Sequence, residues 1–140
     1  GRIAMWHALG EGVAPIKLKT VAAAVFTRPE IATVGISQRA IDAGEVPART
    51  IMLLLSTNPR AKMQGLRRGF VKLFCRPATG AVIGGVVVAP VASELILPIA
   101  LAVQNGLTVD DLAHTFSVYP SLSGSITEAG RQLMQHDDLD

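Results

Sequence analysis

The stretch SVYPSLSGS, Ser117 to Ser125, gathers hydroxyl groups in a way that could serve chemistry. It holds four serines, a proline, a glycine and Tyr119, the only tyrosine of the chain. A serine becomes a good nucleophile only beside a general base, and this stretch contains no His, Cys, Lys, Asp or Glu. The chain also has no Gly-x-Ser-x-Gly elbow. Composition and spacing alone therefore do not indicate a self-sufficient enzyme.

Metal and nucleotide sites find little support in the sequence. His7, His114 and His136 are scattered, and none has a second ligand at metal-binding spacing on a predicted element. The segment GAVIGG, Gly80 to Gly85, matches neither a GxGxxG dinucleotide fingerprint nor a Walker loop. We therefore expect no metal site in this chain.

Basic residues are concentrated in the middle of the chain. No acidic residue lies between Glu45 and Glu94. The basic residues in that segment are Arg49, Arg60, Lys62, Arg67, Arg68, Lys72 and Arg76. Such a segment could attract an anionic ligand or nucleic acid. Apart from Phe70 and Phe74, no aromatic residue accompanies the charges for base stacking, so a solvated face is the favoured interpretation and no nucleic-acid partner is predicted.

Nothing in the sequence indicates a membrane or secretory protein. The longest apolar run, Leu95 to Val103, is about half of the roughly 20 residues that a membrane span needs. The first residues, Gly1 to Gly12, lack a basic start followed by an apolar core. Cys75 is the only cysteine, which excludes an internal disulfide and a CxxC pair. A reducing, cytoplasmic location is expected.

Four segments are predicted to be strands because they are apolar, rich in β-branched residues and bounded by turn residues. They are Thr20 to Thr27, Ala48 to Ser56, Phe70 to Arg76 and Ala81 to Ala89. The last two are separated by Pro77-Ala78-Thr79-Gly80, which predicts a hairpin. Val71, Leu73 and Cys75 share one apolar face, so Cys75 is expected to be a small buried residue rather than a nucleophile.

Helices are predicted from caps and apolar periodicity. A long apolar helix from Val91 should end at Gly106, with a kink or break at Pro98. Ser125 and Glu128 have the spacing of a capping box and predict the start of the last helix. Shorter helices are predicted from Ile3 to Leu9, between Ser37 and Gly44, and after Thr108. The order of elements predicts an α+β fold, an antiparallel sheet flanked by helices.

Four stretches, taken in order, resemble one protein family closely. They are AAVFTRPEIATVGIS, RAKMQG, GFVKLF with TGAVIGGVVVAPVASELI, and TVDDLAHTFSVYPSLSGSITEA. Together they are similar to the C-terminal dimerisation domain of the FAD-dependent pyridine nucleotide–disulfide oxidoreductases, which include dihydrolipoamide dehydrogenase and glutathione reductase. Within that family the chain most resembles the actinobacterial NAD(P)H:quinone reductase flavoproteins.

The resemblance implies a division of the chain and a set of partners. Residues 1–19 would be the end of a preceding FAD-binding domain or a linker, and residues 20–140 the C-terminal dimerisation domain. A homodimer is implied, with FAD and NAD(P)H bound by upstream parts of the full-length protein and a small-molecule acceptor such as a quinone. No cofactor is expected on this fragment alone.

The resemblance also aligns the stretch from Ser117 to Ser125 with a known loop of the family. In the disulfide reductases of the family the last loop reads His-Pro-Thr-x-x-Glu and enters the partner's active site beside the flavin. On that pattern Tyr119 stands at the His position, Pro120 matches the Pro, and Gly124 replaces the Glu. Tyr119 and Pro120 are therefore the candidates for contact with the partner's flavin, and a cis Tyr119–Pro120 peptide is expected.

The missing His–Glu pair bears on the reaction. In the family that pair moves protons in thiol chemistry. A tyrosine in a model peptide has a pKa of about 10, so it is a poor base near neutral pH. Hydride transfer from NAD(P)H through FAD to a quinone does not need the pair. The departure therefore favours a quinone over lipoamide as the acceptor.

Three interpretations stay open. In the first, the chain is part of a quinone reductase, and Tyr119 either contacts the acceptor or only packs at the interface while Ser121 or Ser123 caps the last helix. In the second, it is part of a dihydrolipoamide dehydrogenase with a displaced base, for which His114 is the nearest candidate. In the third, it is a non-catalytic binding module that uses the basic segment.

Overall fold

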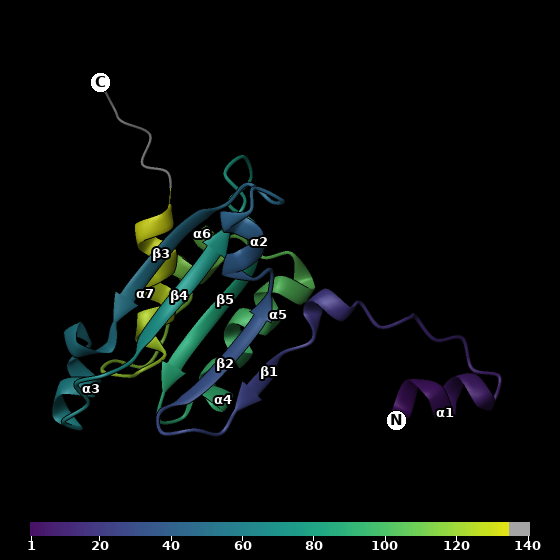
Figure 1. Ribbon diagram of the computed structural model, residues 1–140, viewed down its shortest axis with the longest axis horizontal. Helices are drawn as coiled ribbons and strands as arrows, with labels where there is room; N and C mark the ends of the chain where they lie inside the picture. The colour runs from purple at the N-terminus through teal and green to yellow at the C-terminus, as the bar shows by residue number, and fades with distance from the viewer. Residues whose placement is uncertain (135–140) are drawn as a thin grey trace.

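A five-stranded antiparallel sheet forms the centre of the molecule (Figure 1), in a computed structural model that describes residues 1–134. The strand order is β1-β2-β5-β4-β3, and every neighbouring pair is antiparallel. The strands are β1 (Ala23–Val25), β2 (Glu30–Gly35), β3 (Arg49–Leu54), β4 (Phe70–Cys75) and β5 (Val82–Ala89). The predicted α+β class and the hairpin of β4 and β5 are confirmed.

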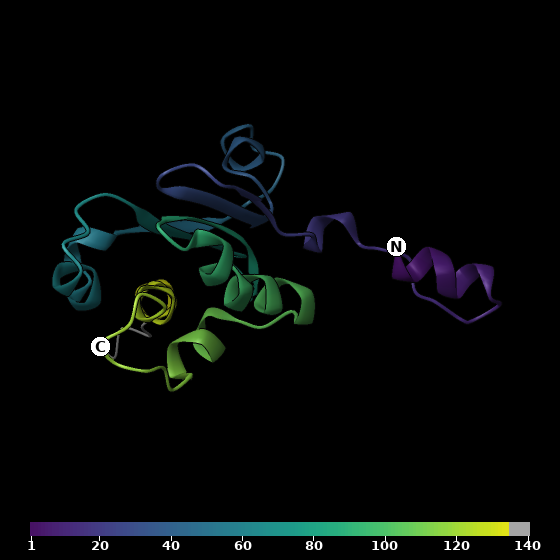
Figure 2. The ribbon, with the colours of Figure 1, turned by 90° about the horizontal axis from the view of Figure 1, so that it is seen from below.

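The helices are distributed unequally over the two faces of the sheet. They are α1 (Arg2–Ala8), α2 (Gln38–Asp42), α3 (Pro59–Met63), α4 (Ala92–Leu95), α5 (Leu97–Asn105), α6 (Val109–His114) and α7 (Gly124–Leu133), with short 3₁₀ turns η1 (Leu18–Thr20) and η2 (Leu55–Thr57). Figure 2 shows α4 to α7 together on one side of the sheet and α2 on the other. None of the helices within residues 1–134 is long and apolar enough to cross a membrane.

The hydrophobic core lies between the sheet and helices α4 to α7. Val71 and Leu73 of β4 point into it and are fully buried, as their alternation predicts. Ile99 of α5 and Ile126 of α7 are also fully buried against the sheet side. Each such side chain contributes about 1.5–3 kcal/mol by leaving water. Cys75 belongs to the same core, as expected.

One predicted strand was wrong in extent, and another strand was not predicted. The segment from Thr20 to Thr27 is a strand only over β1, and Thr20 belongs to η1. Strand β2 was not predicted, although it lies between β1 and β5. The ladder of β1 ends at Val25, before Pro29, and the chain then turns and returns as β2, with the Thr27 hydroxyl donating to the Pro29 carbonyl oxygen at 2.7 Å.

The long apolar helix is interrupted, as expected, but the break lies at Ile96, two residues before Pro98. It consists of α4 and α5, and Ile96 lies between them. Pro98 lies in the first turn of α5, where its missing N–H leaves no hydrogen bond unmade. Gly106 ends α5 in the left-handed conformation, with φ of 67°, as the sequence predicts.

Helix α1 lies apart from the sheet (Figure 1). It has no buried residue, and Met5, Trp6 and Leu9 leave their apolar side chains exposed. An amphipathic helix normally covers its apolar side against a neighbouring element. The assignment of residues 1–19 to a preceding domain or linker stays a prediction.

One carboxylate ties β2 to the helical layer. Oε2 of Glu30 accepts hydrogen bonds from the backbone N–H of Ser93 at 3.0 Å and from its hydroxyl at 2.7 Å. These bonds favour the ionised carboxylate and lower the pKa of Glu30 below its ordinary value. Because the folded-state pKa is lowered, the stabilisation is present above the unfolded-state pKa and is lost as the pH falls through the folded-state pKa.

Glu30→Gln is expected to lower the unfolding temperature at a pH of about 7, because a neutral amide is a weaker acceptor for both Ser93 donors. The difference from the unmodified chain should shrink as the pH falls below about 4, where the wild-type carboxyl also becomes neutral. Thermal unfolding followed by circular dichroism across this pH range measures the difference in unfolding temperature. An unfolding-temperature difference that is the same at every pH would contradict the assignment.

Candidate functional site

The segment between α6 and α7 has an exposed outer half and an anchored inner half. We call Phe116–Tyr119 the outer half and Pro120–Ser125 the inner half. Phe116 is fully exposed, and Tyr119 is 80% exposed. Ser125, by contrast, is buried at the start of α7. The Tyr119–Pro120 peptide between the halves is cis, as predicted.

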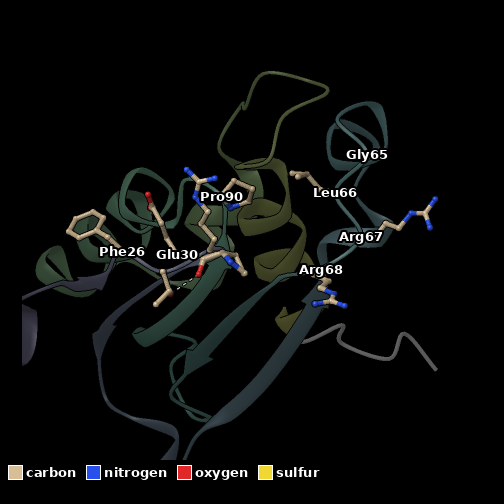
Figure 3. A pocket seen from close by; sticks show the side chains of 10 residues that line it. Phe26, Glu30, Gly65, Leu66, Arg67, Arg68 and Pro90 are labelled. Atoms are coloured by element: carbon tan, nitrogen blue, oxygen red, sulfur yellow. Dashed lines mark hydrogen bonds between the residues drawn. The ribbon is translucent and has the colours of Figure 1, made fainter.

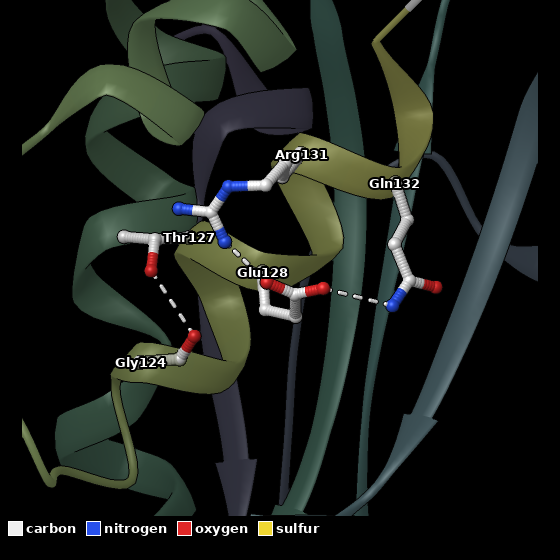
Figure 4. A network of polar contacts seen from close by, with 5 residues as sticks. All are labelled: Gly124, Thr127, Glu128, Arg131 and Gln132. Carbon is white, nitrogen blue, oxygen red and sulfur yellow. Dashed lines mark hydrogen bonds and ion pairs between the residues drawn. The ribbon is translucent and has the colours of Figure 1, made fainter.

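The inner half is held by its own hydroxyl groups. Ser121 Oγ accepts a hydrogen bond from the backbone N–H of Gly124 at 3.1 Å, which satisfies one of the free donors at the start of α7. Ser123 Oγ lies 3.0 Å from Ser121 Oγ. The Thr127 hydroxyl donates to the Gly124 carbonyl oxygen at 3.1 Å (Figure 4). Of the two serines expected to cap the helix, Ser121 is the one that accepts from its backbone.

The predicted capping box of Ser125 and Glu128 is wrong. Helix α7 already begins at Gly124, and the Ser125 hydroxyl accepts a hydrogen bond from Asn58 Nδ2 at 2.8 Å. Glu128 instead accepts from Arg131 and from Gln132, the latter at 3.0 Å (Figure 4). The Ser-x-x-Glu spacing also occurs inside helices, so it does not by itself identify a helix cap. Here the Ser125 hydroxyl is hydrogen-bonded instead to Asn58, which is buried and distant in sequence.

A pocket of about 340 Å³ lies between this segment and the η2–α3 turn. Tyr119 and Gly124, the two predicted catalytic positions, both line it, whereas Pro120 is not among its lining residues. The opposite wall includes Thr57, Asn58 and Pro59. The structure therefore brings the two positions together on one cavity.

The pocket offers hydrogen-bonding groups but no acid–base pair at these positions. Gly124 has no side chain, and within residues 1–134 the Tyr119 hydroxyl makes no hydrogen bond. Glu128 and Arg131, which sequence reasoning did not single out as site residues, also line the pocket, one and two turns further along α7. The i, i+4 spacing from Gly124 to Glu128 was the available signal. Their ion pair leaves the Glu128 carboxylate already engaged.

The other candidate residues lie elsewhere. His114 ends α6, with Nδ1 2.8 Å from the carbonyl oxygen of Asp110, and it is not among the described residues that line the Tyr119 pocket. Cys75 is fully buried, and burial raises the pKa of its thiol. In the described part of the chain, no cluster of three or more His, Cys, Asp or Glu side chains could hold a metal ion. His136 lies outside the described residues.

Part of the basic segment lines a second, more open pocket of about 720 Å³. Figure 3 shows Arg67 and Arg68 extending away from Glu30 and Pro90, in different directions. Phe26 adds an apolar wall at the opposite end. These guanidinium groups do not converge on one point, so the pocket does not have the geometry of an anion site.

Comparison with known proteins gives one consistent result. The family profile described as "Pyridine nucleotide-disulphide oxidoreductase, dimerisation domain" matches residues 21–130. A NAD(P)H dehydrogenase (quinone) of Mycobacterium tuberculosis is 75% identical over 140 residues, which is 100% of this chain. A dihydrolipoyl dehydrogenase of Haloferax volcanii is 37% identical over 135 residues, or 96% of this chain. The chain spans 28% of the length of each of these relatives.

A solved structure agrees with this result. The crystal structure of LpdA from Mycobacterium tuberculosis matches with a TM-score of 0.92 and 74% sequence identity. The match covers 96% of this chain and 29% of that one. The resemblance predicted from the four sequence stretches is therefore confirmed, and so is the fold it implied.

Tyr119→Phe is expected to change the free energy of unfolding of the chain by no more than about 0.5 kcal/mol, because the side chain is exposed and its hydroxyl has no partner within residues 1–134. Chemical denaturation of the two chains measures the difference. A loss above about 1 kcal/mol would mean that the tyrosine has a structural role within this chain.

Proposed function

The chain belongs to the family of pyridine nucleotide-disulphide oxidoreductase dimerisation domains, and on that basis we propose that it dimerises an FAD-dependent NAD(P)H oxidoreductase that reduces quinones. Residues 1–19 would be the end of the preceding FAD-binding domain or a linker, and residues 20–140 the dimerisation domain. The single observation that carries the proposal is that Tyr119 and Gly124 line one pocket. On the family pattern these residues would stand where disulfide chemistry uses a His–Glu pair.

A second copy of the chain is the proposed occupant of the exposed apolar surface on the helical side. On α5, Leu97 is 59% exposed and Leu101 is 48% exposed. Phe116 and Val118, in the outer half of the last loop, are exposed as well. Exposed apolar side chains of this kind often mark protein interfaces, and the family is described as a dimerisation domain. The dimer would form through α5 and the last loop.

The outer half of the loop is proposed to complete the flavin site of the partner subunit. Its exposed tyrosine ring fits contact with a group held outside this chain, and Pro120 limits the conformations of the backbone beside it. When bound, the flavin supplies the redox chemistry, taking a hydride from NAD(P)H and passing electrons to the acceptor. The Tyr119 hydroxyl can donate a hydrogen bond to a carbonyl oxygen of the acceptor.

The alternatives have weaker support. A dihydrolipoyl dehydrogenase with a displaced base is suggested by the Haloferax volcanii relative, but His114 does not line the Tyr119 pocket. A nucleic-acid-binding module would need converging basic groups, and Arg67 and Arg68 point in different directions. The name of the 75% identical relative and the missing acid–base pair both favour a quinone acceptor.

The first test uses the full-length protein with NAD(P)H and either a quinone or lipoamide. We expect quinone reduction to exceed lipoamide turnover, and Tyr119→Phe to lower kcat/KM for the quinone by about two- to tenfold, the effect of one lost hydrogen bond. Ser37→Ala, which removes a hydroxyl at the start of α2 and is not among the residues lining the pocket, is the control. Brisk lipoamide turnover would overturn the quinone assignment. If Tyr119→Phe left kcat/KM for the quinone unchanged, the tyrosine would have only a structural role.

The second test concerns the interface. Light scattering of the chain over a wide concentration range should show a dimer, and Leu97→Glu should weaken it at least about tenfold, because the charge would be buried without a partner. Met52→Glu is the control, since Met52 is 48% exposed on β3 and lies on the sheet face opposite to Ile51 and Leu53, which pack against the core. A strict monomer at every concentration, or equal weakening by both variants, would contradict the proposed surface.

A further inference from the structure

We infer that Asn58 is a positioning residue that fixes the inner half of the last loop on α3 and thereby sets where Tyr119 stands. Asn58 is 7% exposed, and it lies at the start of α3, more than sixty positions before the residues it binds. The placement of Tyr119 is a property of this chain alone. Its effect on acceptor turnover rests on the function proposed above.

All the hydrogen-bonding groups of the Asn58 amide are used. Oδ1 accepts from the backbone N–H of Ala61 at 3.1 Å and caps α3. Nδ2 donates to the Ser121 carbonyl oxygen at 2.9 Å and to the Ser125 hydroxyl at 2.8 Å. An amide has one acceptor oxygen and two N–H donors, so the side chain is fully satisfied. It therefore joins the start of α3 to the inner half of the last loop through one residue.

The η2–α3 turn, to which the loop is fixed, is itself anchored in the core. Leu55 and Ala61, on either side of Asn58, are fully buried. The backbone N–H of Asn58 donates to the Leu55 carbonyl oxygen at 2.9 Å, and that of Leu55 donates to the Gly69 carbonyl oxygen at 3.0 Å. The Asn58 amide therefore projects from a support that is continuous with the end of β3.

The anchor lies close enough to Tyr119 to set its direction. The bonded carbonyl belongs to Ser121, and only Pro120 separates that residue from Tyr119. Proline has a nearly fixed φ and restricts the residue before it, so few free torsions remain between the anchor and the tyrosine. Ser121 also caps α7 through its hydroxyl. Removing the Asn58 donors would therefore free the loop just beside Tyr119.

An aspartate at this position separates the two roles of Asn58. Asn58→Asp keeps an oxygen that can accept from Ala61 and cap α3, but it has no N–H to donate to the Ser121 carbonyl. A carboxylate beside that carbonyl would also repel it. Ser37→Ala is the matched control, because Ser37 Oγ caps α2 by accepting from Ala40 at 3.2 Å and lies outside the loop contacts.

Tyr119 is the only tyrosine of the chain, so fluorotyrosine labelling gives a single ¹⁹F resonance that reports on it alone. In Asn58→Asp that resonance should shift and broaden or split, whereas in Ser37→Ala, which removes a helix cap outside the loop contacts, it should stay in place. Ser125→Ala, which removes one of the two acceptors, should shift it in the same direction by less. This variant carries the test if Asn58→Asp does not fold.

A second arm measures quinone reduction by the full-length protein. Asn58→Asp should lower kcat/KM for the quinone at least about threefold and leave KM for NAD(P)H unchanged, as expected for an effect of the order of one hydrogen bond. An unmoved Tyr119 resonance in both loop variants, or an equal shift in Ser37→Ala, would overturn the inference. A moved resonance with unchanged turnover would support the positioning role and instead count against the proposed function of the loop.

Discussion

The packing of α7 on the sheet and on α6 determines where the last loop can lie. Ile126, Ala129 and Leu133 form the buried side of α7, so the helix has one rotational setting against the core. At Gly130 the helices approach so closely that a Cβ would stand 2.9 Å from the Val109 carbonyl oxygen. With α7 fixed in this way, its first turn presents Gly124 to the pocket, and the loop can leave only toward Tyr119.

Local patterns in the sequence predicted much of this fold. Alternation in β4 placed Val71 and Leu73 in the core, and the capping box of Thr108 with Asp111 marked the start of α6. The predictions that failed concern residues held by contacts distant in sequence. Strand β2 is held by pairing on both sides, and its short, polar beginning gave little local signal. Ser125 was predicted to cap a helix from its spacing to Glu128. That prediction failed because its actual partner, Asn58, lies far away in the sequence.

The residues of the candidate site likewise divide into those that the sequence singled out and those that it did not. The motif singled out Tyr119, Pro120 and Gly124, and two of them, Tyr119 and Gly124, line the same pocket. Asn58 could not be predicted, since it joins Glu128 and Arg131 on that pocket only when the start of α3 meets the start of α7. Under the proposed function, the chain would supply an interface, an anchored loop and an exposed tyrosine while the flavin supplies the redox chemistry, so it would need no base of its own.

The central claim is that Tyr119 stands beside the flavin site of a second subunit, and cross-linking tests it most directly. A photoreactive benzoylphenylalanine would replace Tyr119 in the full-length protein, and the control would carry it at Met52, which is also exposed but lies on the other face of the sheet. The account predicts that irradiation links position 119 covalently to the partner subunit, close to its flavin, and that position 52 gives no such product. Links from position 119 that stay within one subunit would contradict it.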